Sequence, residues 1–120
     1  MKGIGIDIGG TETKVAVVEK DSGVVFFESF KTPFLDRYPD FVEALSLRLK
    51  KIIQKYHVAH ICMAIAGDVD SKKGILRFAP NLGGWRDKNI KYDFEKRCGV
   101  EVMVENDANM AIWGSYVFEL

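Results

Sequence analysis

A pair of short apolar runs joined by a glycine-rich turn constrains the fold of this chain more than any other feature. The first run, Lys2–Ile8, is rich in isoleucine, and the second, Lys14–Glu19, is rich in valine. Both compositions are typical of buried β-strands. The short gap at Gly9-Gly10-Thr11 therefore predicts a β-hairpin.

The remaining chain alternates between strand and helix signals. An apolar stripe at helical spacing follows Pro39 and runs to Tyr56, which predicts a long helix. The other predicted elements are strands at Val24–Lys31, His60–Ala66, Ile75–Phe78 (short) and Glu101–Glu105, helices at Asn89–Cys98 and Asp107–Leu120, and an irregular segment at Ala79–Trp85. The sequence thus predicts an α/β domain over residues 1–120, with helices on the faces of a mixed five-stranded sheet. Its expected order is hairpin, strand, helix, strand, helix, strand, helix.

Composition limits the function classes. Lys and Arg together number 17, as do Asp and Glu, and this zero net charge argues against a surface built for nucleic acid or an anionic membrane. Cys62 and Cys98 lack zinc-site spacing and do not make a disulfide framework. We expect both thiols to be reduced and buried, no zinc site in this segment, and a cytoplasmic setting.

The first candidate site is the hairpin turn, Asp7-Ile8-Gly9-Gly10-Thr11-Glu12-Thr13-Lys14. Consecutive N–H groups in a glycine-rich turn can form a nest for an anion, and Lys14 adds positive charge. Asp7 is suitable for holding a hydrated Mg²⁺ beside phosphates. A plain hairpin turn, in which Asp7 satisfies backbone donors, is the alternative. Neither a Walker A loop nor a dinucleotide fingerprint is present.

Two further candidates are polar segments. Glu105-Asn106-Asp107-Ala108-Asn109 lies between a predicted strand and helix. Asp107 either caps that helix or acts as a general base toward a hydroxyl, and Asn106 suits a sugar diol. Pro80-Asn81-Leu82-Gly83-Gly84-Trp85 offers another amide, or else is a loop with Trp85 in the core.

The candidate site residues lie at or just after the carboxyl ends of predicted strands. Asp7 ends the first strand, Gly67 follows the strand His60–Ala66, and Asn106-Asp107 follows the last strand. Because mixed sheets of this type bind ligands beyond the carboxyl ends of their parallel strands, one shared cleft is expected.

Other features are interpreted without a functional role. Asp68-Val69-Asp70 resembles the start of a calcium loop, but lysines then take ligand and glycine positions. His57 and His60 are expected at the surface rather than on a metal. The lysines of the long helix (Lys50, Lys51 and Lys55) are interpreted as a solvated face.

Four segments in this order resemble the ROK (repressor, ORF, kinase) family of sugar kinases. They are Asp7-Ile8-Gly9-Gly10-Thr11-x-x-Lys14, Ala64-Ile65-Ala66-Gly67-x-Val69-Asp70, Pro80-Asn81-Leu82-x-Gly84-Trp85 and Glu105-Asn106-Asp107-Ala108-Asn109. The resemblance covers nearly the whole chain and implies the amino-terminal lobe of an actin-like, ribonuclease H-like ATPase fold.

The resemblance also implies roles for the residues. Asp107 would be the base that activates a sugar hydroxyl, with Asn81, Asn106 and Gly67 at the sugar. ATP phosphates would contact Gly9, Gly10 and Thr11, with Lys14 nearby and Mg²⁺ at Asp7. Glu105 would orient its loop.

Family members are roughly two to three times longer, and their second lobe carries the adenosine pocket. The expectation is therefore a lobe that is inactive by itself and works with its own carboxyl-terminal lobe, in a full-length protein that can form a homodimer. Two alternatives stay open: the lobe of a sugar-sensing regulator, although Met1 nearly abuts the first strand, and a non-catalytic actin-like assembly module.

Overall fold

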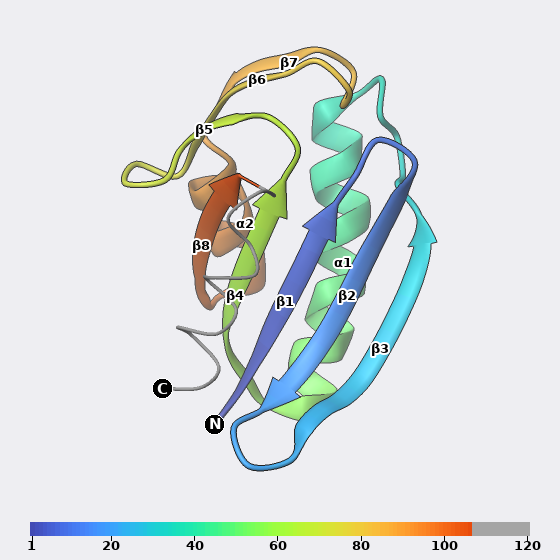
Figure 1. The fold of residues 1–120 in the computed structure, drawn as a ribbon, viewed down its shortest axis with the longest axis vertical. Coiled ribbons are helices and arrows are strands. Elements are labelled where there is room, and N and C mark those ends of the chain that lie inside the picture. Colours follow the sequence, from blue (N-terminus) through green and yellow to red (C-terminus); the bar gives the residue numbers. More distant parts are fainter. Residues whose placement is uncertain (107–120) are drawn as a thin grey trace.

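The computed structural model describes residues 1–106, which form an α/β domain (Figure 1). Its elements are β1 (Lys2–Ile8), β2 (Glu12–Glu19), β3 (Gly23–Lys31), α1 (Tyr38–Tyr56), β4 (Val58–Ile65), β5 (Asp68–Asp70), β6 (Ile75–Ala79), β7 (Trp85–Lys88), α2 (Ile90–Cys98) and β8 (Glu101–Asn106). The predicted helix over 107–120 lies outside the described residues. No helix within residues 1–106 is both long and apolar enough to cross a membrane.

The main sheet has five strands in the order β3-β2-β1-β4-β8. The pairs β1/β2 and β2/β3 are antiparallel, whereas β1/β4 and β4/β8 are parallel. This confirms the predicted hairpin and the mixed five-stranded sheet. Alternation places Ile4, Ile6 and Ile8 of the central strand in the core, where each is 0% exposed.

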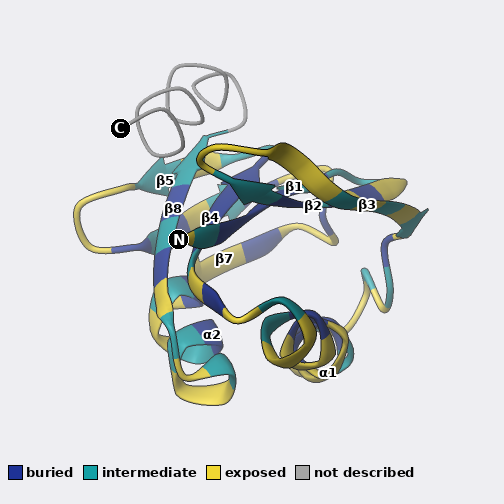
Figure 2. Ribbon diagram, turned by 90° about the horizontal axis from the view of Figure 1, so that it is seen from below, coloured by how far each residue is buried: buried dark blue, intermediate teal, exposed yellow. Residues whose placement is uncertain are grey.

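Both described helices lie side by side on one face of this sheet (Figure 2). Helix α1 has proline in its first turn and ends at His57, whose φ of 57° is left-handed. Its predicted stripe is confirmed, since Phe41, Leu45, Leu49 and Ile52 are buried. Helix α2 begins after Asn89, whose side chain accepts from the Tyr92 N–H, and ends at Gly99 with φ of 72°.

A second sheet, β5-β6-β7, was not predicted from the sequence, although its middle strand β6 confirms the short strand expected at Ile75–Phe78. The segment before Trp85 was expected to be irregular, and Asp70 to start a turn. These strands are three to five residues long and alternate poorly, so their side chains carry little signal. Antiparallel pairing with β6 defines them instead.

An aromatic cluster joins the second sheet to the helices. Trp85 is 6% exposed, which confirms its expected place in the core. Its ring centroid lies 4.8 Å from that of Phe41, which in turn lies 6.1 Å from Phe94. These contacts hold α1, α2 and β7 together behind the strand ends.

Candidate functional site

The candidate segments gather at the carboxyl ends of β1, β4 and β8. The Gly9-Gly10-Thr11 turn follows β1, Gly67 follows β4, and Asn106 is the last residue of β8. Because β1, β4 and β8 run parallel, all three lie at one edge of the sheet (Figure 1). The predicted convergence of these strand ends is therefore confirmed.

Hydrogen bonds of two buried threonines hold the hairpin turn in place. The Gly9 N–H donates to the Glu12 carbonyl at 3.0 Å, and the Thr32 hydroxyl donates to the Gly9 carbonyl at 2.8 Å. Thr32 and Thr13 are buried and their hydroxyl oxygens lie 2.8 Å apart. Sequence reasoning missed this support, because Thr32 follows β3, far from the turn in the chain. One N–H of the predicted nest is thus used inside the hairpin.

Gly10 and Gly67 are needed because other backbone segments lie against them. A Cβ on Gly10 would come 2.7 Å from the Asn81 carbonyl oxygen, and a Cβ on Gly67 would come 2.7 Å from the Phe78 carbonyl oxygen. Real Cβ atoms do not approach oxygen so closely. The end of β6 therefore lies against Gly67, and the loop after β6 lies against Gly10, which brings the exposed Asn81 beside the hairpin.

Asn106 connects β8 to the end of β4. Its amide Nδ2 donates to the Gly67 carbonyl oxygen at 2.5 Å, and its own N–H donates to Glu105 Oε1 at 3.0 Å. Glu105 therefore contacts the backbone at Asn106. Gly10, Asn81, Gly67 and Asn106 form one contiguous edge.

A row of side chains crosses the sheet next to this edge. Lys14 pairs with Asp7, Asp7 with Ala64, and Ala64 with Glu105. Directly paired residues project to the same face, here the one opposite Ile6 and Ile8. Asp7 and Glu105, two strands apart, are separated by roughly 10 Å at the backbone.

The donor set at Asp7 fits a hydrated magnesium ion. Mg²⁺ keeps several waters and needs only one or two carboxylates besides substrate phosphates. Residues 1–106 contain no group of three His, Cys, Asp or Glu side chains close enough to enclose a metal. Asp7, with the Lys14 ammonium in the same row, suits a water-mediated ion beside phosphates and not an all-protein cage. Asp107, the predicted base, lies outside the described residues.

Asp70, His57 and His60, which were set aside from the site, have different surroundings. Asp70 accepts from the Lys73 N–H and the Arg77 guanidinium, and its pKa is lowered mainly by the backbone hydrogen bond. His57 is exposed as expected, but His60 is half-buried, so the prediction of a surface residue was wrong. Burial lowers the pKa of His60, and Glu101 opposes that effect.

The cysteines differ in exposure. Cys62 is 6% exposed, as expected for a core residue, whereas Cys98 is only half-buried. Both are free thiols. Burial, and then Glu101, raise the pKa of Cys62 to about 12.

The sequence model of the ROK family matches residues 3–120. The chain belongs to the ROK family. It is 34% identical to the glucokinase of Streptomyces coelicolor over 119 residues, which cover 96% of this chain and 35% of that protein. It thus spans about a third of the length of that relative.

Solved ROK structures show the same fold. A glucokinase of Streptomyces griseus, in complex with glucose and AMPPNP, superposes with a TM-score of 0.83 and 34% identity, over 100% of this chain and 38% of that one. A ROK family transcriptional regulator, a homolog of E. coli MLC protein, superposes with a TM-score of 0.82 over 98% of this chain and 30% of that one. At 20% identity, the regulator shows the shared fold alone.

Proposed function

We propose that this chain is the amino-terminal lobe of an ATP-dependent sugar kinase with the actin-like, ribonuclease H-like fold. The reaction would transfer a phosphoryl group from MgATP to a hydroxyl of a hexose or N-acetylhexosamine. The observation that carries the proposal is the contiguous edge formed by the hairpin turn, Asn81, Gly67 and Asn106. The similarity to glucokinases supports it.

The proposed roles follow from the chemistry of each group. Asn81 and Asn106 donate to and accept from sugar hydroxyls, and Glu105 keeps Asn106 oriented. Asp107 takes the proton from the attacking hydroxyl as its oxygen bonds to phosphorus.

The phosphate end of the reaction belongs to the hairpin. The turn Gly9-Gly10-Thr11 and the Lys14 ammonium bind the transferred phosphates. Asp7 holds Mg²⁺ through water, and the ion supplies charge neutralisation on the phosphate oxygens.

We expect the 120-residue chain to bind sugar but not to turn it over, since it spans only about a third of the glucokinases it matches. Closure around both reactants is needed to orient them and exclude water. We propose that a second lobe supplies the rest of the cleft, that the whole protein acts in the cytoplasm, and that it can pair as a homodimer.

Sugar titration followed by backbone amide chemical shifts tests the proposal. Glucose or an N-acetylhexosamine should shift signals at residues 9–11, 67, 79–82 and 105–106. Asn81→Ala should weaken binding about tenfold, because a site built around an amide loses a hydrogen-bond partner. Gln54→Ala, which removes an exposed amide on α1, should leave affinity unchanged. No shift with any sugar would favour an actin-like assembly module.

The second candidate is a sugar-sensing lobe that binds no nucleotide, since a ROK family transcriptional regulator shares this fold. MgATP titration separates the two. A kinase lobe should show shifts at Gly9, Gly10, Thr11 and Lys14, and Lys14→Ala should reduce them. Sugar binding without any nucleotide response would support the regulator. Measurable hexose phosphorylation by the 120-residue chain would contradict its expected inactivity.

A further inference from the structure

A groove of about 530 Å³ lies between α1 and α2, in the helix layer and away from the strand ends. It is lined by Tyr38, Pro39, Val42 and Lys50 of α1 and by Asp93, Lys96 and Arg97 of α2. None of these residues belongs to the candidate kinase site. Its volume falls within the range typical of small-molecule sites.

The groove concentrates positive charge on a chain whose total charge is zero. Lys50, Lys96 and Arg97 line it with Asp93 as the one acid. Within residues 1–106, none of these three cations has a carboxylate within 4.0 Å, whereas six other basic groups do. The acid is engaged at the other end, where the Tyr38 hydroxyl donates to Asp93 Oδ2 at 2.7 Å.

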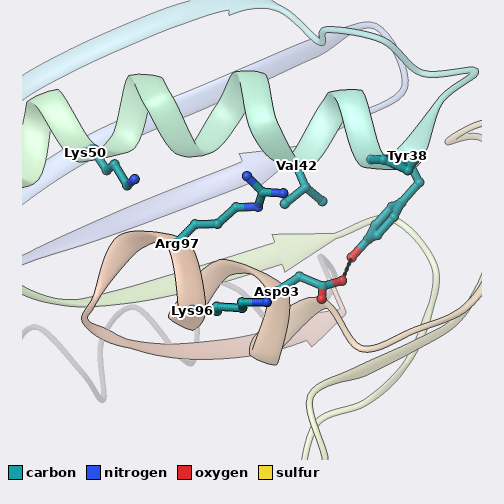
Figure 3. A pocket seen from close by; sticks show the side chains of 7 residues that line it. Tyr38, Val42, Lys50, Asp93, Lys96 and Arg97 are labelled. Atoms are coloured by element: carbon teal, nitrogen blue, oxygen red, sulfur yellow. Dashed lines mark hydrogen bonds between the residues drawn. The ribbon is translucent and has the colours of Figure 1, made fainter.

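Two of the cations, Lys50 and Arg97, come from different helices and face the same space. Figure 3 shows Lys50 projecting from α1 and Arg97 reaching from α2 toward Val42, whereas Lys96 extends toward Asp93, which accepts from the Tyr38 hydroxyl. The Cys98 thiol reports the same convergence. Burial raises the pKa of Cys98, and the Ser46 hydroxyl, followed by the charges of Lys50 and Arg97, opposes that rise. Lys50 and Arg97 therefore form a cationic part of the groove, and the Tyr38–Asp93 hydrogen bond, with Lys96 drawn beside it, forms another part.

Helix electrostatics account for only part of this arrangement. Lys96 and Arg97 occupy the last turn of α2, where the helix dipole favours cations. Lys50 is not in the last turn of α1, where Lys55 is the basic residue. Lys50 is exposed, as the sequence-based interpretation of the α1 lysines as a solvated face expects, and it also lines the groove toward α2.

We propose that this groove binds a small phosphate ester that carries hydroxyl groups, the chemistry of a sugar phosphate. The phosphate lies between Lys50 and Arg97, because a dianion is repelled from Asp93. The hydroxyls lie at the other end, where Asp93 Oδ1 is an acceptor and Tyr38 closes the groove. Val42 and Pro39 contact the carbon skeleton.

The proposal stands independently of kinase chemistry, and its test uses the full 120-residue chain. Glucose 6-phosphate, inorganic phosphate and glucose are titrated at constant ionic strength, with amide chemical shifts as the readout. Glucose 6-phosphate should shift residues 38–42, 50 and 93–98, and phosphate alone should do so more weakly. Shifts at 9–11 and 79–82 would instead report the strand-end site, so failure of either proposal is visible separately.

Matched lysine variants sharpen the test. Lys50→Ala and Arg97→Ala should each weaken glucose 6-phosphate binding about tenfold, the loss of one charge-assisted hydrogen bond. Lys51→Ala removes the same charge one residue along, on a part of α1 that lines a different hollow, and should change affinity less than about twofold. Equal losses in Lys50→Ala and Lys51→Ala would reveal only diffuse attraction and overturn the proposal. So would the absence of groove shifts at matched ionic strength.

Discussion

The strand-end site and the groove between α1 and α2 are assembled by different parts of the chain. At the strand ends, backbone lies on backbone: Gly10 meets the Asn81 carbonyl and Gly67 meets the Phe78 carbonyl. In the groove, long side chains from two helices face each other across open space. At Gly10 and Gly67 there is no space for an added Cβ atom. In the groove, by contrast, the lining side chains can be substituted without moving the helices that carry them.

This difference separates geometry from chemistry. The strand-end site owes its shape to glycines, whose missing side chains let backbone segments lie close together. These glycines position the neighbouring groups to which the chemistry is assigned. The groove owes its character to its charges, while its shape comes from the aromatic contacts beneath α1. Substitutions in the two regions should therefore fail in different ways.

The largest effect is expected from the aromatic support of the groove. Phe41 is 0% exposed and touches Trp85, Phe94 and Tyr38. Phe41→Ala should lower the free energy of unfolding by about 3–5 kcal/mol, measured by urea titration, because it leaves a cavity that the surrounding elements cannot fill. Leu47→Ala, on the same helix at 56% exposure, is the control and should cost less than about 1 kcal/mol. Similar costs for both would show that the helices are not held by this cluster.

The next effect concerns the backbone contact at the strand ends. Gly10→Ala should cost about 1–3 kcal/mol, because the new methyl group has to push away the loop at Asn81. Asn81→Ala is the matched control, since it keeps the carbonyl oxygen that Gly10 contacts. We expect that variant to unfold near the wild-type urea midpoint while losing sugar affinity. A Gly10→Ala protein of wild-type stability would contradict the conclusion that close backbone contact shapes the strand-end site.

Sequence reasoning succeeded where the placement of a segment follows from a local pattern. Asp7, Gly9 and Gly10 directly follow or end a strand, and parallel strands bring their ends together, so the edge was predictable. Thr32 was not, because its partner Gly9 is remote in the chain and nothing local marks the contact. The strand β7 was missed because pairing, and not side-chain alternation, defines it.

The groove could not be predicted for a related reason. Lys50 and Arg97 belong to different helices, and only their packing on one face of the sheet makes them neighbours. Each lysine of α1 looked solvated by itself. The role of Asp107 stays a prediction, since it lies outside the described residues.

A smaller effect is expected where α2 joins β8. Glu95 Oε2 accepts from the Val102 N–H at 3.0 Å and from Lys91 Nζ at 2.9 Å. Burial alone would raise the pKa of Glu95, but these hydrogen bonds and the Lys91 charge lower it overall. Glu95→Gln should lower the free energy of unfolding by about 1–2 kcal/mol at pH 7.

The sign of the pH dependence follows from that lowered pKa. The stability that the Glu95 carboxylate contributes is present above its ordinary value of 4.5 and is lost as pH falls through and below it. The gap between wild type and Glu95→Gln, followed by urea titration, should therefore be constant at pH 6–8 and close in acid. The control, Glu43→Gln, removes an exposed α1 carboxylate and should show no comparable gap. A gap that widened in acid would refute this assignment.

The smallest effect is expected in the chemical labelling of the two cysteines, Cys62 in the main sheet and Cys98 beside the groove. Labelling measures access to each thiol and not the free energy of unfolding. Cys62 lies in β4 at 6% exposure, and with a pKa of about 12 only about one thiol in ten thousand is ionised at pH 8. Cys98 is half-buried at the end of α2, where Lys50 and Arg97 act on its thiol. Iodoacetamide should therefore modify Cys98 first. Glucose 6-phosphate in the groove should slow that reaction, because it neutralises the two cations, and should leave Cys62 unaffected. Equal reaction rates for Cys62 and Cys98 in the folded chain would contradict this prediction, because they would require the sheet around Cys62 to open readily.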